Sequence, residues 1–181
     1  RFINRIKAKI PSENHSLVFG GTQYSGESYF NGISIINHTG QTSHVYQKKR
    51  LMPFGEYIPL QSFFSAISHL DILSKYAGFT KGHNPNLLQV SGIPFGTAIC
   101  LESCYINPFR KQTLDGAKFL AVVVNTAWFS QEKASLQHLH SSILRAAENQ
   151  RYLIQSSNTG YSVIISPKGQ LLSEIPFRTQ G

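Results

Sequence analysis

Two short apolar runs with a helix-like segment between them constrain the fold more than any other feature of this sequence. Residues 94–99 and 119–124 are each long enough for one buried strand, and the second is the longest uninterrupted apolar run in the chain. Residues 103–114 between them predict a helix. Because apolar strands that alternate with helices are typical of a sheet covered by helices, the pattern predicts an α/β fold.

The rest of the chain extends this pattern in both directions. Residues 16–21, 32–37 and 43–47 predict strands, with turns at Gly20-Gly21 and at residues 38–40, so the first third resembles a β meander. Residues 61–73 and 133–150 have apolar residues at helical spacing, and residues 78–86 predict a long loop. In the second helix the positions that recur at three and four residues are Leu136, Leu139, His140, Ile143, Leu144 and Ala147. Residues 152–156, 162–165 and 171–175 predict further strands.

Composition excludes several classes of protein. The 181 residues suit a single domain, and 41% hydrophobic residues with 14% charged residues argue against disorder and coiled coils. No apolar run approaches the roughly 20 residues that a membrane-spanning helix needs, and we expect no span. The net charge of +8 suggests an anionic partner, either nucleic acid or a lipid surface. Since the sequence has no nucleic-acid-binding motif, we expect no nucleic acid to bind.

Cys100 is the leading candidate for a reactive residue. It ends the first apolar strand where a helix is predicted to begin, and a helix N-terminus would lower the pKa of the thiol. The alternative is a small buried hydrophobic residue. Cys104, four residues on, could face Cys100 on a helix, and a free thiol is equally open. Glu102 would need solvent or a positive partner, which Lys48-Lys-Arg50 could provide; otherwise these three cations form a solvated patch.

Motifs along nearly the whole chain resemble the nitrilase-like domain of bacterial apolipoprotein N-acyltransferases, within the carbon-nitrogen hydrolase superfamily. The motifs are, in order, Lys48-x-x-Leu51-x-Pro53-Phe54-Gly55-Glu56-Tyr57-x-Pro59, Ile99-Cys100-x-Glu102, Asn125-x-Ala127-Trp128-Phe129, Gln137-His138, Arg145-Ala146-x-Glu148-x-x-Arg151 and Asn158-x-Gly160. The resemblance implies an α/β fold of the α-β-β-α sandwich type. It also implies that residues 1–181 are a single, partial domain, truncated at its N-terminus.

The resemblance also implies a reaction. Cys100 would take an acyl chain from a phospholipid as a thioester and pass it to the N-terminal amine of a lipoprotein's diacylglyceryl-cysteine. Lys48 would stabilise the oxyanion, with Glu56 and Glu102 as supporting acids. Asn125, Trp128 and Phe129 would bind substrate, although the two aromatic residues could equally be core residues. The implied location is the periplasmic side of a bacterial inner membrane, with the membrane surface as a partner.

The superfamily's first triad residue, a Glu that serves as general base, has no counterpart that we can place in this sequence. We therefore expect the parent protein to be an enzyme and this chain alone to be inactive. Two other functions stay open, a soluble amidase and a non-catalytic fragment or paralogue.

No cofactor or metal is expected. His138 and His140, two residues apart, should point to different faces of their helix, and no set of ligands at metal-binding spacing accompanies them. Arg145, Glu148 and Arg151 could form an ion-paired helix face, and residues 158–160 predict a turn.

Overall fold

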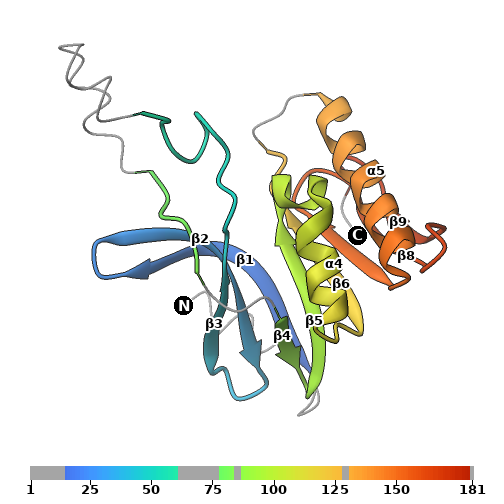
Figure 1. The fold of residues 1–181 in the computed structure, drawn as a ribbon, viewed down its shortest axis with the longest axis horizontal. Helices are drawn as coiled ribbons and strands as arrows, with labels where there is room; N and C mark the ends of the chain where they lie inside the picture. Colours follow the sequence, from blue (N-terminus) through green and yellow to red (C-terminus); the bar gives the residue numbers. More distant parts are fainter. Residues whose placement is uncertain (1–14, 61–77, 84–86, 128–130, 180–181) are drawn as a thin grey trace.

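The computed structural model describes residues 15–60, 78–83, 87–127 and 131–179, which form two β-sheets and a helical layer (Figure 1). The smaller sheet is antiparallel, in the order β1-β2-β3, from Ser16–Ser25, Ser28–Asn37 and Thr42–Gln47. The larger sheet has six strands in the order β4-β5-β6-β7-β8-β9. Its strands are Leu87–Val90, Ile93–Ile99, Phe119–Val124, Leu153–Ser157, Ser162–Ile165 and Leu171–Ile175.

Strands β5, β6 and β7 are parallel, and the other neighbours in the larger sheet are antiparallel. A short 3₁₀ helix, η1 (Cys100–Cys104), and α4 (Ile106–Leu114) connect β5 to β6, and α5 (Glu132–Asn149) precedes β7. Both α-helices lie on the same face of the larger sheet (Figure 1). Parallel strands joined through helices bring the ends of β5 and β6 to one edge of the sheet, where ligands bind in α/β folds.

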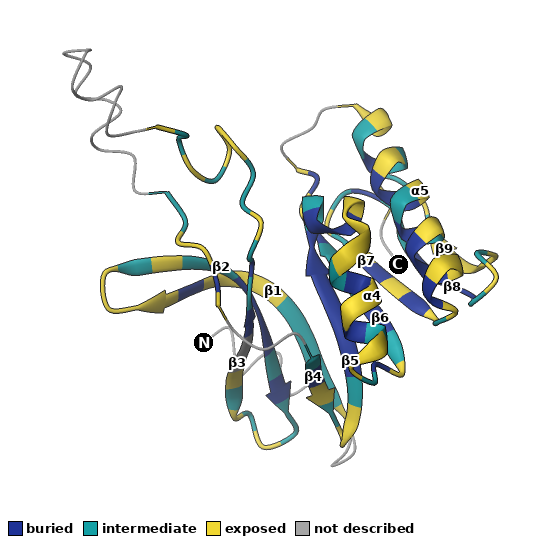
Figure 2. Cartoon of the chain, in the orientation of Figure 1, coloured by how far each residue is buried: buried dark blue, intermediate teal, exposed yellow. Residues whose placement is uncertain are grey.

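Two hydrophobic clusters hold the layers together (Figure 2). One fills the space between the helices and the larger sheet and includes Phe109, Leu120 and Leu153, which are fully buried. The other lies between the sheets, where Ile33 of β2 packs with Phe95 of β5. The predicted α/β sandwich therefore has a real core on each side of the larger sheet.

The predicted turn at Gly20-Gly21 is wrong, because β1 continues through both glycines to Ser25. A Cβ atom on Gly20 would lie 2.7 Å from Val123 Cγ1, whereas one on Gly21 would meet nothing within 4 Å. Gly20 is therefore explained by the close approach of the two sheets. The chain turns at Gly26 instead, with a φ of 58° that suits glycine.

The remaining predictions of strands, helices and loops can be compared with the structure one by one. All eight predicted strands lie where expected within a few residues, but β4 was missed. The helix expected from residue 103 starts as η1 at Cys100 and becomes α-helical only at Ile106. The helix predicted for residues 61–73 lies outside the described residues. Residues 78–83 have no regular secondary structure, as predicted.

The buried face of α5 differs from the predicted one. His140 and Ala147 are exposed and Leu144 is 54% exposed. The buried side is mostly polar instead: Ser135, His138, Leu139, Ser142, Arg145, Ala146 and Asn149. Several of those polar groups find partners: Ser142 donates to Gln155 Oε1 and Arg145 to the carbonyl of Cys104. None of the described helices is both long enough and apolar enough to cross a membrane.

Candidate active site

Cys100 lies at the sharp junction between β5 and η1, where it packs against both hydrophobic clusters. Its φ of 52° is in the left-handed region, which is strained for a residue with a side chain. Both cysteines are free thiols, with Cys100 partly buried and Cys104 exposed. A strained, partly buried thiol at the carboxyl end of a central strand is the arrangement expected of a nucleophile.

The expected effect of the helix N-terminus on Cys100 is wrong. Burial raises the pKa of the Cys100 thiol, because a thiolate is costly to desolvate. The positive charge of Lys48 and the backbone N–H groups of Leu101 and Asn125 act in the opposite direction, while the charge of Glu56 adds to the increase. The groups that favour the thiolate are therefore a neighbouring cation and individual N–H groups. The α-helix α4 does not contribute, because it starts only at Ile106, six residues after Cys100.

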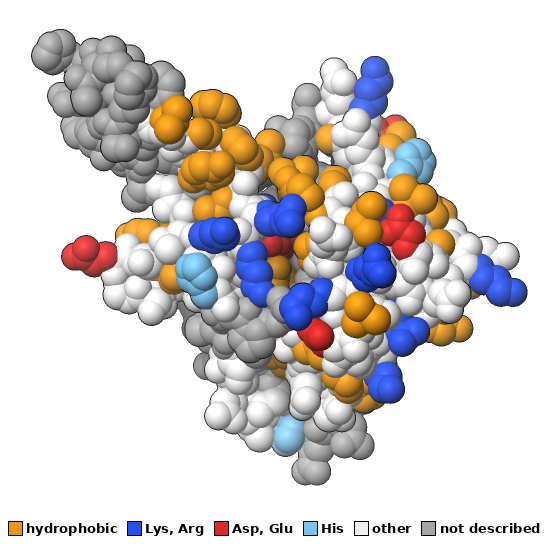
Figure 3. Space-filling view, in the orientation of Figure 1, with side chains coloured by type: hydrophobic (Ala, Val, Ile, Leu, Met, Phe, Trp, Pro, Cys, Tyr) orange, Lys and Arg blue, Asp and Glu red, His pale blue; other side chains and the backbone are white. Residues whose placement is uncertain are grey.

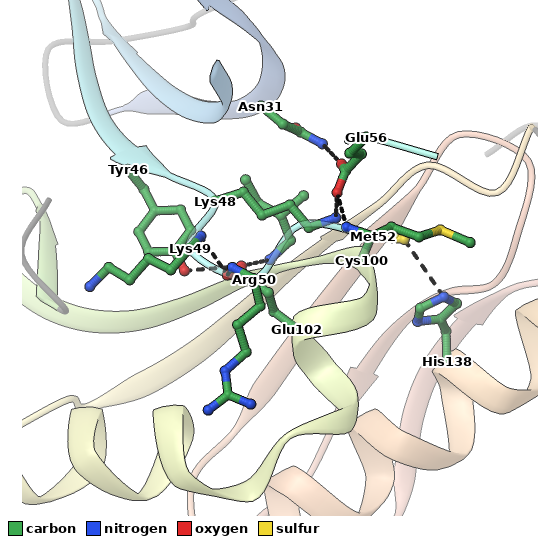
Figure 4. Close-up of polar contacts among 11 residues, drawn as sticks. Asn31, Tyr46, Lys48, Lys49, Arg50, Met52, Glu56, Cys100, Glu102 and His138 are labelled. Carbon is green, nitrogen blue, oxygen red and sulfur yellow. Dashed lines mark hydrogen bonds and ion pairs between the residues drawn. The ribbon is translucent and has the colours of Figure 1, made fainter. Parts of the chain in front are cut away.

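Lys48 is almost completely buried, with 1% of its side chain exposed, and it forms an ion pair with Glu56. Its Nζ lies 2.7 Å and 2.9 Å from the two carboxylate oxygens of Glu56 (Figure 4). The same carboxylate accepts hydrogen bonds from the side chain of Asn31 and from the backbone N–H of Met52, each at 2.7 Å. Lys48 is thus fixed beside Cys100 with its charge compensated, and it is no solvated patch residue.

The two neighbouring cations behave differently from Lys48. The guanidinium of exposed Arg50 stacks 4.1 Å from the ring centroid of Tyr105, and the ammonium of Lys49 lies 5.9 Å from that of Tyr46. The alternative of a basic surface patch therefore holds for Arg50 and fails for Lys48.

Glu102 is 2% exposed and accepts hydrogen bonds that join two parts of the chain. Its Oε1 accepts from the backbone N–H groups of Lys49 and Arg50, and its Oε2 from that of Ile99 and from the Tyr46 hydroxyl (Figure 4). Burial and this carboxylate raise the pKa of Tyr46. Glu102 is therefore paired with neutral donors rather than with a cation. These hydrogen bonds hold the segment after β3 against the Cys100 turn.

His138 is the site residue that the sequence reasoning missed. It is 8% exposed on α5, and its Nε2 lies 3.7 Å from Cys100 Sγ (Figure 4). Burial and the charge of Lys48 lower the pKa of His138, so its imidazole is neutral near pH 7. The sequence signal was the motif Gln137-His138, which is one of the motifs shared with the family but to which we assigned no role. As expected, His138 and His140 lie on different faces, one buried and one exposed.

Asn125 follows β6, and its side chain is exposed. Its Oδ1 accepts hydrogen bonds from the backbone of Ala127 and from Asn158 Nδ2, which ties the end of β6 to the bend at residues 158–160. The ion pair expected for Arg145 and Glu148 is present at 2.9 Å, whereas Arg151 donates to the carbonyl of Ala117. Trp128 and Phe129 lie outside the described residues.

Residues 6–181 match the carbon-nitrogen hydrolase family. The chain belongs to that family. Its fold agrees with other carbon-nitrogen hydrolases: it superposes on an amidase from Nesterenkonia sp. with a TM-score of 0.67, at 20% identity, covering 97% of this chain and 62% of the amidase. The predicted nitrilase-like fold is thus confirmed.

Sequence relatives confirm the narrower resemblance to apolipoprotein N-acyltransferases. The chain is 35% identical over 143 residues to the apolipoprotein N-acyltransferase of Aquifex aeolicus, covering 78% of this chain and 31% of the relative. It is 31% identical over 178 residues to that of Pseudomonas putida, covering 94% of this chain and 34% of the relative. The chain thus spans about a third of the length of these relatives.

Proposed function

We propose that this chain carries the cysteine and lysine of an N-acyltransferase that works through a thioester on Cys100. The single observation that supports this best is the ammonium of Lys48, buried, paired with Glu56 and close enough to Cys100 for its charge to favour the thiolate. The similarity to apolipoprotein N-acyltransferases adds the class of reaction and a lipoprotein as acceptor.

In the proposed first half-reaction, Cys100 Sγ attacks the ester carbonyl carbon of a phospholipid. The C–O bond to the glycerol breaks, and the lysophospholipid leaves as an alcohol with the proton that the thiol gave up. The ammonium of Lys48 stabilises the oxyanion that forms in between. In the second half-reaction, the N-terminal amine of the diacylglyceryl-cysteine attacks the thioester. An amide forms as the C–S bond breaks, and the proton that the amine loses restores the Cys100 thiol.

The remaining site residues would support these steps. Glu56 would hold the ammonium of Lys48 in position, and Glu102 would hold the segment after β3 against the Cys100 turn rather than transfer a proton. Asn125, Trp128 and Phe129 would line the acyl-chain site beyond the end of β6, where flat side chains suit an alkyl chain.

We also place this domain at the periplasmic surface of an inner membrane. Apolar side chains gather over the segment after β3, and Lys and Arg side chains gather beside them on the same face (Figure 3). Phe54 and Leu60 of that segment are 77% and 70% exposed. Apolar groups beside cations suit a surface of anionic headgroups, because each cation near such a surface adds about 1 kcal/mol of attraction.

The test is to trap the thioester. Full-length protein in detergent is incubated with phospholipid whose acyl chain carries a label, and we expect label on Cys100 that neutral hydroxylamine releases. Cys104→Ser is the matched control, since Cys104 is an exposed thiol four residues away, and it should be labelled normally. Cys100→Ala should remain unlabelled.

An unlabelled wild-type protein would contradict the proposal. Hydrolysis of a short amide without any lipid requirement would favour the amidase alternative instead.

A further inference from the structure

The imidazole of His138 connects Cys100 to a buried serine. Its Nε2 lies 3.7 Å from Cys100 Sγ, and its Nδ1 lies 3.3 Å from the hydroxyl oxygen of Ser103. Ser103 is fully buried in η1, and His138 is 8% exposed on α5. Because both ring nitrogens have a partner, the neutral ring must donate to one of them and accept from the other.

The surroundings of Cys100 Sγ decide between these two arrangements. The backbone N–H groups of Leu101 and Asn125 hydrogen bond to this sulfur, and the ammonium of Lys48 acts on it as a positive charge. These groups stabilise a negatively charged sulfur, against the burial that disfavours it. The charge of Glu56 opposes them, but this carboxylate is already paired with Lys48. Burial outweighs these groups, so the pKa of the thiol is raised and the thiolate that reacts needs a further donor. A ring nitrogen that faces this thiolate is placed as a donor, because a thiolate has no proton to give.

We propose that His138 is a further catalytic residue, which donates a hydrogen bond from Nε2–H to the Cys100 thiolate while the Ser103 hydroxyl donates to Nδ1 and fixes this tautomer. His138 gains and loses no proton in this role. It lowers the energy of the thiolate relative to the thiol, as a neutral N–H group does for an anion.

This inference rests on the proposed function for its consequence in the reaction. The thiolate is the nucleophile in the first half-reaction and the leaving group in the second, so one hydrogen bond from His138 serves both. Ser103 acts only through His138 and is a positioning residue.

Thiol alkylation tests the proposal without any lipid substrate. Iodoacetamide forms a C–S bond with Cys100 and releases iodide, and the dependence of its rate on pH gives the pKa of the thiol. In full-length protein carrying Cys104→Ser, we expect His138→Ala to raise this pKa by about one unit, because a hydrogen bond to a charged group is worth about tenfold or more in equilibrium.

At a pH below the wild-type value, alkylation should then be roughly tenfold slower, with an unchanged rate at high pH. His138→Gln can still present a neutral N–H group and should shift the pKa by less than half as much. His140→Ala is the matched control from the exposed face of the same helix and should leave it unchanged. The charges of Lys48 and Glu56 also act on Cys100 and are retained in every variant.

A pKa in His138→Ala equal to that of wild type would overturn the proposal, and so would an equal shift in His138→Gln. A measurement on unmutated His138 decides the matter if His138→Ala does not fold. The ring ¹⁵N chemical shifts should show a proton on Nε2 and none on Nδ1, whereas the opposite tautomer would overturn the proposal. Both readouts are independent of acyl transfer, so an absent thioester would count against the proposed function and leave this inference intact.

Discussion

The ion pair of Lys48 and Glu56 makes a strong prediction about stability. Glu56→Gln keeps the shape of the side chain and removes its charge, which leaves the ammonium of Lys48 buried without a counter-charge. Lys48 has 1% of its side chain exposed and Glu56 has 13%, so little water can replace the lost carboxylate. Breaking a buried pair by removing one partner costs about 3–5 kcal/mol.

The hydrogen bonds of Glu56 add to this cost. One carboxylate oxygen accepts from Asn31 and the other from the backbone N–H of Met52, and the ammonium of Lys48 lies within 2.9 Å of both. A glutamine amide has only one acceptor oxygen, so its NH₂ group must face one of these donors in either orientation. We therefore expect Glu56→Gln to lower the free energy of unfolding by about 3 kcal/mol or more.

The assay is hydrogen exchange of the backbone N–H groups of β5 to β7 in increasing urea, which reports the unfolding of this domain within the full-length protein. The control is Asp115→Asn, which removes a surface pair with Lys111 whose side chains are 39% and 63% exposed. It should cost less than about 1 kcal/mol. Adding Lys48→Met to Glu56→Gln should recover part of the loss, since no buried charge then remains. A loss in Glu56→Gln no larger than that in Asp115→Asn would refute the reasoning.

Four further predictions follow from other parts of the structure. Gly20→Ala should lower the free energy of unfolding by about 1–3 kcal/mol because its Cβ would clash with Val123, whereas adjacent Gly21→Ala should be neutral or slightly stabilising; equal effects in urea titrations would contradict this. Because burial lowers the pKa of His138, the folded state loses stability as the pH falls below about 6.5 towards that lowered value, and His138→Gln should flatten this part of the pH profile of unfolding. Ile164 of β8 is 41% exposed, and among the described strands β1 pairs only with β2, so the 181-residue chain should self-associate on a sizing column and Ile164→Lys should reduce this. Binding to anionic vesicles should weaken with salt, and binding that ignores salt would argue against an electrostatic contribution.

Most of the strands and the long helix α5 were predictable because their signal is local. The apolar runs of β5 and β6 can each be recognised within a few neighbouring residues. The helical spacing of α5 repeats every three or four residues, so it can also be read from the segment itself. The turn assigned to Gly20-Gly21 failed for the opposite reason. Glycine permits both a turn and a close contact between sheets, and only the position of Val123, about a hundred residues away, decides which one applies.

The face of α5 failed for a related reason. Periodicity assigns a buried face to apolar residues, but here the buried face has Ser142, Arg145 and His138, each with a polar partner. The partners belong to other elements, so the sequence of the helix itself has no sign of them.

The candidate site also has a part that the sequence predicts and a part that only the tertiary structure decides. The motif residues Lys48, Glu56 and Cys100 could be selected from the sequence, because their order and spacing match a known family. The sequence alone did not determine what each one contacts. Only the tertiary structure paired Lys48 with Glu56, gave Glu102 to backbone N–H groups and brought His138 to the sulfur of Cys100. The physical reason is that burial, charge compensation and hydrogen bonding are set by residues distant in the chain, whereas local order fixes only which residue types are available.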